Sequence, residues 1–195
     1  IVEFRGNTWG VEQIGAAGCW GAYEARGQGA RIAVLDTGID PQHPALEGRI
    51  AGFAAFGPDG QTVTEGVENA RDSGRHGTHV AATAAGGRVD GRWLGVAPGA
   101  EVLAGLVLDG GAGTDVQIIA GMDWAVRRGA SVINLSLGGL RFGPEVLDVY
   151  TLPILQANLE GIPVVVAMGN DGSQTSGTPG NDVFAFTVGA TDYRD

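Results

Sequence analysis

Short, continuously apolar runs recur along the chain and alternate with longer stretches in which apolar residues repeat at helical spacing. Runs without internal polar positions are typical of strands that are covered on both faces of a sheet. Such runs predict strands at 31–36, 101–107, 131–137, 162–168 and 183–189, and a weaker one at 49–56. The alternation of strands and helices predicts an α/β fold, a three-layer, mostly parallel, doubly wound sheet with helices on both faces.

Two intervening stretches carry clear helix signals. The stretch 114–128 begins with Thr114 and Gln117, which form a capping-box pattern, and Gly129 follows its end. The stretch 77–86 is rich in alanine, which favours a helix that packs closely against a sheet.

Two other stretches contain helix-breaking or turn residues. We expect a helix over 144–160, with a break or a fresh start near Pro153, because proline does not fit a helix interior. The turn residues of 57–75 predict turns and an exposed loop.

Composition narrows the class of protein. The 195 residues are 44% hydrophobic and 17% charged, which predicts a single domain, 1–195, with a sizeable core. The net charge of −10 argues against binding to nucleic acid or to an anionic membrane surface. No run approaches the roughly 18 apolar residues of a membrane-spanning helix. The single cysteine, Cys19, excludes an intramolecular disulfide, and we expect it to be buried beside Trp20.

A carboxylate and an imidazole are the first candidates for chemistry. Asp36 follows a buried apolar run directly, and His76 stands at the start of a predicted helix. Taken alone, Asp36 also fits an aspartate that caps the next turn. An imidazole that acts as a general base, however, needs a carboxylate to hold its second nitrogen. We therefore expect Asp36 and His76 to lie within hydrogen-bond reach.

The neighbours of these residues point to a known family. Three motifs occur in order: Ile32-Ala33-Val34-Leu35-Asp36-Thr37-Gly38-Ile39-Asp40, His76-Gly77-Thr78-His79-Val80 and Ala167-Met168-Gly169-Asn170-Asp171-Gly172. The chain thereby resembles the N-terminal two thirds of the catalytic domain of subtilisin-like serine proteases (subtilases). The resemblance implies catalytic Asp36 and His76, and an Asn170 that donates to the oxyanion. It also implies a secreted or extracellular enzyme, although this segment carries no signal peptide.

The resemblance further implies a groove that binds a polypeptide substrate in extended conformation. Two glycine-rich segments would form its walls and present backbone groups to the peptide. The alternative is that both are ordinary turns. The segments are Gly111, Ala112 and Gly113, and Ser136, Leu137, Gly138 and Gly139.

The resemblance also implies a nucleophilic serine that completes a catalytic triad with Asp36 and His76. The sequence offers no candidate for this serine. None of the serines opens a helix followed by small residues, and no Gly-x-Ser-x-Gly motif occurs. The serines are Ser73, Ser131, Ser136, Ser173 and Ser176. We therefore expect this chain to lack the serine-bearing C-terminal part of the domain and to be inactive alone. Three alternatives stay open: a serine-less pseudoprotease or peptide-binding module, one chain of a two-chain protease, and a metal-dependent hydrolase that uses His76 and His79.

No cofactor is required by this chemistry, and no metal ligands are assigned. Calcium is possible as a structural ion at an unknown site, because Ala45 stands where the family's common site has an aspartate. Other candidate ligands are Asp40, Asp90 and Asp109.

The expected absence of the serine-bearing part also has a consequence for stability. Apolar residues of 31–36 and 131–137 would be uncovered, and self-association or a complementing chain would then fill the gap.

Overall fold

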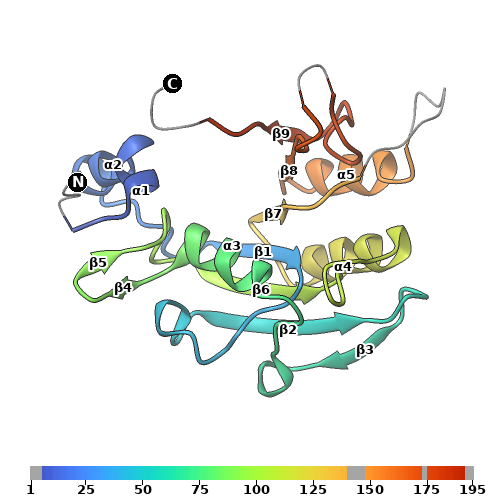
Figure 1. Ribbon diagram of the computed structural model, residues 1–195, viewed down its shortest axis with the longest axis horizontal. Helices are drawn as coiled ribbons and strands as arrows, with labels where there is room; N and C mark the ends of the chain where they lie inside the picture. Colours follow the sequence, from blue (N-terminus) through green and yellow to red (C-terminus); the bar gives the residue numbers. More distant parts are fainter. Residues whose placement is uncertain (1–5, 140–147, 173–174, 192–195) are drawn as a thin grey trace.

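The computed structural model describes residues 6–139, 148–172 and 175–191 (Figure 1). In this part of the chain, seven strands form one sheet in the order β3-β2-β6-β1-β7-β8-β9. All neighbouring pairs are parallel except β2 and β3. The strands are β1 (Arg31–Asp36), β2 (Ile50–Phe56), β3 (Thr62–Glu65), β6 (Glu101–Leu106), β7 (Val132–Leu135), β8 (Val164–Ala167) and β9 (Phe186–Val188). All six strands that the apolar runs predict are therefore present.

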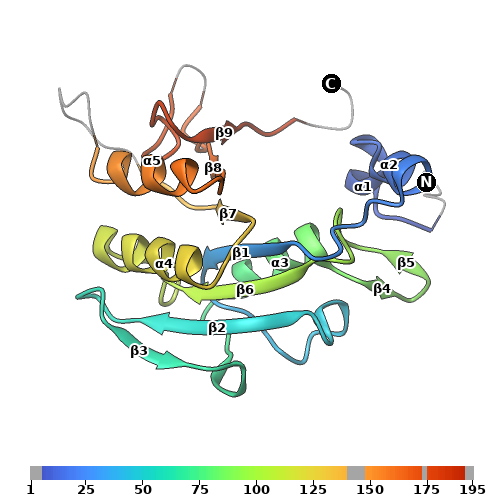
Figure 2. The ribbon, with the colours of Figure 1, turned by 180° about the vertical axis from the view of Figure 1, so that it is seen from behind.

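Helices cover both faces of the sheet, as the sequence predicts (Figures 1 and 2). Successive residues of a strand point to opposite faces. Leu35 of β1 accordingly packs in a core with α4 (Asp115–Arg127) and α5 (Thr151–Leu159). Val34 packs in a second core with α3 (His76–Ala85). The fold is thus a three-layer α/β arrangement.

Helix α4 begins as its sequence predicts. Thr114 Oγ1 accepts a hydrogen bond from the Gln117 N–H at 3.2 Å, and the Thr114 N–H donates to Gln117 Oε1 at 2.9 Å. These two bonds satisfy backbone and side-chain groups that the first turn would otherwise leave unpaired. Gly129, with φ of +71°, follows the end of the helix.

Helix α5 begins close to Pro153. The helix begins at Thr151, so Pro153 lies in its first turn, where a backbone N–H has no partner within the helix. The expected fresh start is therefore confirmed, while residues 144–147 of the expected helix lie outside the described residues.

The expectation of an exposed loop over 57–75 is wrong in part. Strand β3 and the 3₁₀ helix η2 (Val67–Asn69) lie in this stretch, and β3 pairs with β2. An unpaired outer edge on the largely buried β2 would leave backbone groups without partners, which explains the extra strand. Other short elements were not expected from the pattern: α1 (Trp9–Gln13), α2 (Ala16–Tyr23), η1 (Pro44–Leu46), β4 (Arg88–Val89) and β5 (Arg92–Trp93).

One expectation about burial is wrong, and another holds only in part. Cys19 is exposed, because Trp20 is the residue of this turn that faces the core, and neighbours on a helix point about 100° apart. Strand β1 is covered on both faces, because Val34 and Leu35 are buried. On β7, Ile133 and Leu135 are buried on one face, whereas Val132 and Asn134 on the other face are only half-buried. Four of the exposed apolar side chains lie on or just before the edge strand β9: Val183, Phe184, Phe186 and Val188.

The described helices also bear on membrane association. None of them combines the length and the apolar composition that crossing a bilayer requires.

Candidate active site

Asp36 is the last residue of β1, which lies between β6 and β7 in the middle of the sheet. Its side chain is fully buried, so its carboxylate needs hydrogen bonds in place of water. The Thr37 N–H donates to Asp36 Oδ1 at 2.7 Å. Nδ1 of His76 lies 2.8 Å from Oδ1 and 2.9 Å from Oδ2. The expected hydrogen-bonded pair is therefore present.

His76 is the first residue of α3, and its side chain is 57% exposed. The contact with the Asp36 carboxylate, which only accepts hydrogen bonds when ionised, places a proton on Nδ1. In the neutral ring, Nε2 is then the nitrogen with a free lone pair. The pair can thus take up a proton from a group that approaches Nε2.

The residue after His76 explains how the helix approaches the strand end. A Cβ atom on Gly77 would stand 2.1 Å from the Gly38 carbonyl oxygen, so only glycine fits this contact. The Gly77 N–H donates to Thr37 Oγ1 at 2.9 Å. The start of α3 is therefore anchored directly on the turn that follows Asp36.

Asn170 reaches the same edge of the sheet from β8. The strand ends at Ala167, and Gly169, with φ of +110°, turns the chain. Asn170 is exposed and lines the same groove as His76. Within the described residues its side-chain amide has no hydrogen-bond partner, so the amide is available to a ligand.

The groove has a volume of about 790 Å³ and brings together the segments that the sequence singles out. Its lining includes His76, Asn170, Gly111–Gly113 and Ser136–Gly139. Leu108 and Gly113 line one wall, and only glycine fits at position 113, because a Cβ atom there would stand 2.1 Å from the Val107 carbonyl oxygen. The two glycine-rich segments therefore do lie along one cavity with His76.

Gly139 differs from the expectation for this wall. Its N–H donates to the Thr178 carbonyl at 2.9 Å, and its own carbonyl accepts from the Thr178 N–H at 2.9 Å. Both backbone groups are thus already paired and are not free for a peptide. In the described part of the chain, no such backbone pairing engages Ser136, Leu137 or Gly138.

Sequence reasoning missed several residues that line the groove. Tyr150 is buried, and its hydroxyl donates to Asp115 Oδ1 at 2.8 Å. Thr178 forms the pairing with Gly139 described above. Asp115 had one available signal, its place directly after the cap residue Thr114. Tyr150 and Thr178 carry no local signal, because only the packing of distant segments brings them here.

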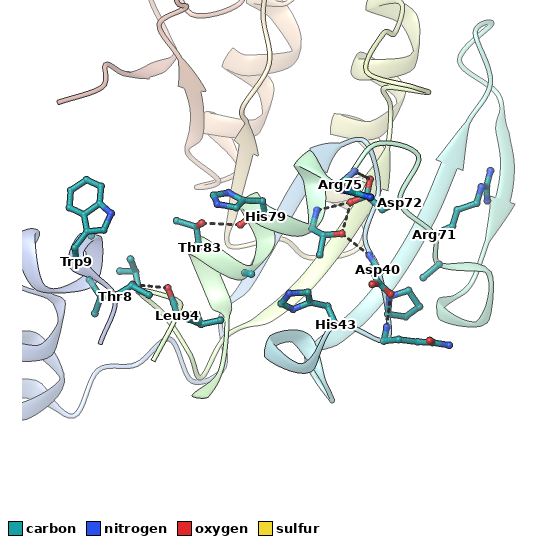
Figure 3. A pocket seen from close by; sticks show the side chains of 18 of the residues that line it. Thr8, Trp9, Asp40, His43, Arg71, Asp72, Arg75, His79, Thr83 and Leu94 are labelled. Carbon is teal, nitrogen blue, oxygen red and sulfur yellow. Dashed lines mark hydrogen bonds between the residues drawn. The ribbon is translucent and has the colours of Figure 1, made fainter. Parts of the chain in front are cut away.

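The other histidines lie outside this groove. His79 is exposed and lines a separate groove between α1 and α3, together with His43 (Figure 3). His76 and His79 therefore do not face one common site. Within the described ranges, no three His, Cys, Asp or Glu side chains gather as metal ligands would. Asp40, Asp90 and Asp109 thus do not form a calcium site with one another.

The described serines are not placed as nucleophiles for His76. Ser73 Oγ donates to the Leu108 carbonyl at 2.9 Å, and Ser131 Oγ accepts from the Arg31 N–H at 3.1 Å. Ser136 lines the groove, but its Oγ accepts from Asn134 Nδ2 at 2.9 Å. Among residues 6–139, 148–172 and 175–191, no serine hydroxyl is hydrogen-bonded to His76. Ser173 lies outside the described residues.

Known proteins similar to this chain are proteases. Serine protease AprX of Bacillus subtilis (strain 168) is 39% identical over 180 residues, which cover 85% of this chain and 39% of that protein. Subtilisin Savinase of Lederbergia lenta is 37% identical over 188 residues, or 96% and 64% of the two chains. An intracellular serine protease of Paenibacillus polymyxa is 36% identical over 190 residues, or 94% and 56%.

The extent of these matches and a match to a family model together show the family of this chain. The chain spans between 39% and 64% of the length of these three relatives. The family model of the subtilases matches residues 27–195, which is most of the chain. The chain therefore belongs to the subtilase family.

Proposed function

We propose that this chain supplies the proton-transfer and oxyanion groups of a serine endopeptidase. The observation that carries the proposal is the hydrogen-bonded Asp36–His76 pair, which opens into a groove that Asn170 also lines. Membership of the subtilase family supports serine-peptidase chemistry.

Each side chain then has a distinct role. A serine hydroxyl attacks the scissile carbonyl, and His76 Nε2 takes the hydroxyl proton and returns it to the leaving amine. Asp36 holds the ring and stabilises the imidazolium. Asn170 donates its amide to the oxyanion of the tetrahedral intermediate. These steps use side chains alone, so the proposed reaction requires no cofactor, and a structural calcium ion has no assigned ligands.

The nucleophile, in this proposal, comes from outside the described residues. The support is that Ser73, Ser131 and Ser136 already make hydrogen bonds elsewhere, and none of the described serines is hydrogen-bonded to His76. These 195 residues alone would then hydrolyse no peptide bond.

The substrate would be a polypeptide in extended conformation. A strand-like peptide needs backbone partners on the walls of the groove. Ser136, Leu137 and Gly138 are suited to this on one wall, and Gly111 and Gly113 on the other. Gly139 is not, and the Ala112 N–H already donates to the Asp109 carbonyl at 3.2 Å.

A further polypeptide segment or a second copy would cover the exposed edge at β9. The support is the group of exposed apolar side chains there, of which Phe186 is 66% and Val183 is 77% exposed. Sedimentation of the chain alone would show association, whereas a monomer with undiminished stability would contradict this part of the proposal.

Secretion is also part of the proposal and rests on family resemblance. One of the three relatives above is named as an intracellular protease, so relatives' names do not favour one compartment. Fractionation of the source cells, followed by immunodetection, would test it.

A peptide-binding module is the second candidate function. It is favoured by the one observation that no described serine is hydrogen-bonded to His76, although the groove and the Asp36–His76 pair are formed. In this case extended peptides would bind in the groove without being cleaved.

A fluorophosphonate probe and unstructured casein distinguish the two. We expect no labelling and no hydrolysis with the 195-residue chain, but both with the natural polypeptide that contains it. His76→Ala should abolish labelling, while the matched control His79→Ala, in the separate groove, should preserve it. Labelling of one of the chain's own serines would contradict the external nucleophile. Peptide binding without any labelling would favour the binding module.

A further inference from the structure

Asp72 accepts an unusual number of hydrogen bonds for a surface-loop carboxylate. Its Oδ1 accepts from Thr37 Oγ1 at 2.6 Å, from the Gly74 N–H at 2.9 Å and from the Arg75 N–H at 2.8 Å. Its Oδ2 accepts from the Thr78 N–H at 2.9 Å and from Thr78 Oγ1. Both oxygens are therefore fully engaged by donors from three parts of the chain.

These donors keep Asp72 ionised. Partial burial raises the pKa of Asp72, but the hydrogen bonds from Thr37, Thr78, Arg75 and Gly74 outweigh it and hold the pKa well below its usual range. The carboxylate is thus a permanent acceptor at neutral pH.

The bonds of Asp72 lead to both partners of the Asp36–His76 pair. Thr37, on one side, also donates its backbone N–H to Asp36 Oδ1 and accepts from the Gly77 N–H. On the other side, the Arg75 N–H and the Thr78 N–H flank His76 in the sequence. One carboxylate therefore joins the end of β1 to the first turn of α3.

The backbone just before His76 needs such a restraint. Arg75 has φ of +97°, a strained conformation that residues with a Cβ atom seldom adopt. Figure 3 shows Asp72 and Arg75 beside each other at the start of α3, with Asp72 bonded into the helix. The bond from the Arg75 N–H to Asp72 helps to hold this turn.

We propose that Asp72 is a positioning residue for the peptidase reaction. Its carboxylate fixes the β1 end and the α3 start in the geometry in which Asp36 and His76 meet. It contacts Thr37, Gly74, Arg75 and Thr78, so it acts through other residues rather than on substrate. The proposal rests on the proposed function, because the reaction is the one assigned there.

Asp72→Asn is the most informative variant, because asparagine has nearly the same shape but cannot replace the carboxylate. In one orientation of its amide, the NH₂ group faces the Thr78 N–H. In the other, the NH₂ group faces the N–H groups of Gly74 and Arg75. In either orientation the NH₂ group of the asparagine faces a backbone N–H group, and two donors cannot form a hydrogen bond. The turn before His76 must therefore shift.

The matched control is Asp40→Asn. It also removes one negative charge, and Asp40 lines the same groove as Asp72 (Figure 3). Its carboxylate, however, accepts from the Gln42 N–H at 2.9 Å, away from the Asp36–His76 pair. A difference between the two variants therefore reports hydrogen bonding rather than charge.

The first measurement is proton NMR of the 195-residue chain, in which the His76 Nδ1 proton bonded to Asp36 should resonate far downfield. We expect Asp72→Asn to lose or broaden this resonance and Asp40→Asn to keep it. The second measurement is peptide hydrolysis by the natural polypeptide. Asp72→Asn should lower kcat about 10- to 100-fold and leave KM within about twofold, because misplacement of a reacting group lowers turnover rather than binding.

If Asp72→Asn does not fold, Thr37→Val and Thr37→Ser test the positioning role of Asp72 instead. Thr37→Val removes one of the five donors to Asp72 together with the acceptor of the Gly77 N–H, and Thr37→Ser keeps both bonds. We expect the valine variant to weaken the downfield resonance and the serine variant to retain it.

The outcomes separate this inference from the proposed function. An unchanged resonance and unchanged kcat in Asp72→Asn, or in Thr37→Val where Asp72→Asn does not fold, would overturn the positioning role. If the natural polypeptide cleaves nothing, the proposed function fails. A loss of the resonance in Asp72→Asn alone would then still establish that Asp72 positions the Asp36–His76 pair.

Discussion

The two halves of the candidate site are built in different ways. The Asp36–His76 half joins a fully buried carboxylate on a central strand to the start of a helix, through hydrogen bonds of 2.7 to 2.9 Å. The Asn170 half is an exposed loop after β8, whose amide has no partner among the described residues. Hydrogen bonds within the protein therefore orient the Asp36 and His76 side chains before any ligand binds. The Asn170 side chain has no such bond among the described residues. Stability and activity should respond differently to changes in each.

The largest effect should come from removing the proposed base, His76. His76→Ala should lower kcat of the natural polypeptide about 10⁶-fold, the loss known for the corresponding change in subtilisin, a relative. It should also lower the free energy of unfolding by about 1–3 kcal/mol, because buried Asp36 loses a hydrogen-bond partner. Casein hydrolysis and urea unfolding measure the two. An equal loss of activity in His79→Ala would indicate a different site.

Removing the proposed oxyanion donor, Asn170, should affect activity alone. Asn170→Ala should lower kcat about 100- to 1000-fold, a range that comes from subtilisin itself. The free energy of unfolding should stay within about 0.5 kcal/mol, because the side chain is exposed. The same two assays apply. A large loss of stability would show that the two halves do not differ as described.

Thr37→Val should affect stability more than the Asn170 change does. The valine removes a buried hydroxyl that donates to Asp72 and accepts from the Gly77 N–H, at a cost of about 2 kcal/mol. Thr37→Ser, which keeps the hydroxyl, is the control. If urea midpoints are the same for the two variants, the hydroxyl does not hold the Asp36–His76 half together.

The acid stability of this half should depend on Asp72. Its folded-state pKa lies below the unfolded value of about 3.9, so its contribution to stability is complete above that pH and is lost as pH falls toward the folded-state pKa. Asp72→Asn should therefore show a flatter fall in stability below about pH 4, while Asp40→Asn should keep the steeper one. Thermal unfolding across this pH range measures the slopes. Identical slopes in all three proteins would contradict the assignment.

Local patterns in the sequence account for much of the fold. The apolar runs predict the strands because a strand covered on both faces excludes polar residues whatever its neighbours are. The start of α4 is equally local, since Thr114 and Gln117 satisfy each other's groups within one turn. Strand β3 was missed because its reason lies elsewhere, in the exposed edge of β2.

The sequence by itself also predicted that Asp36 and His76 meet, because an imidazole base needs a carboxylate and both residues stand in motifs that resemble those of the subtilases. Only the tertiary structure decided that Gly139 is already paired with Thr178 and that Cys19 faces solvent. The same is true of Asp72, which joins the end of β1 to the start of α3. Each of these depends on donors, acceptors or packing partners from segments far apart in the chain. Which partner a polar group finds is set by the packing of those segments, and no local pattern records it.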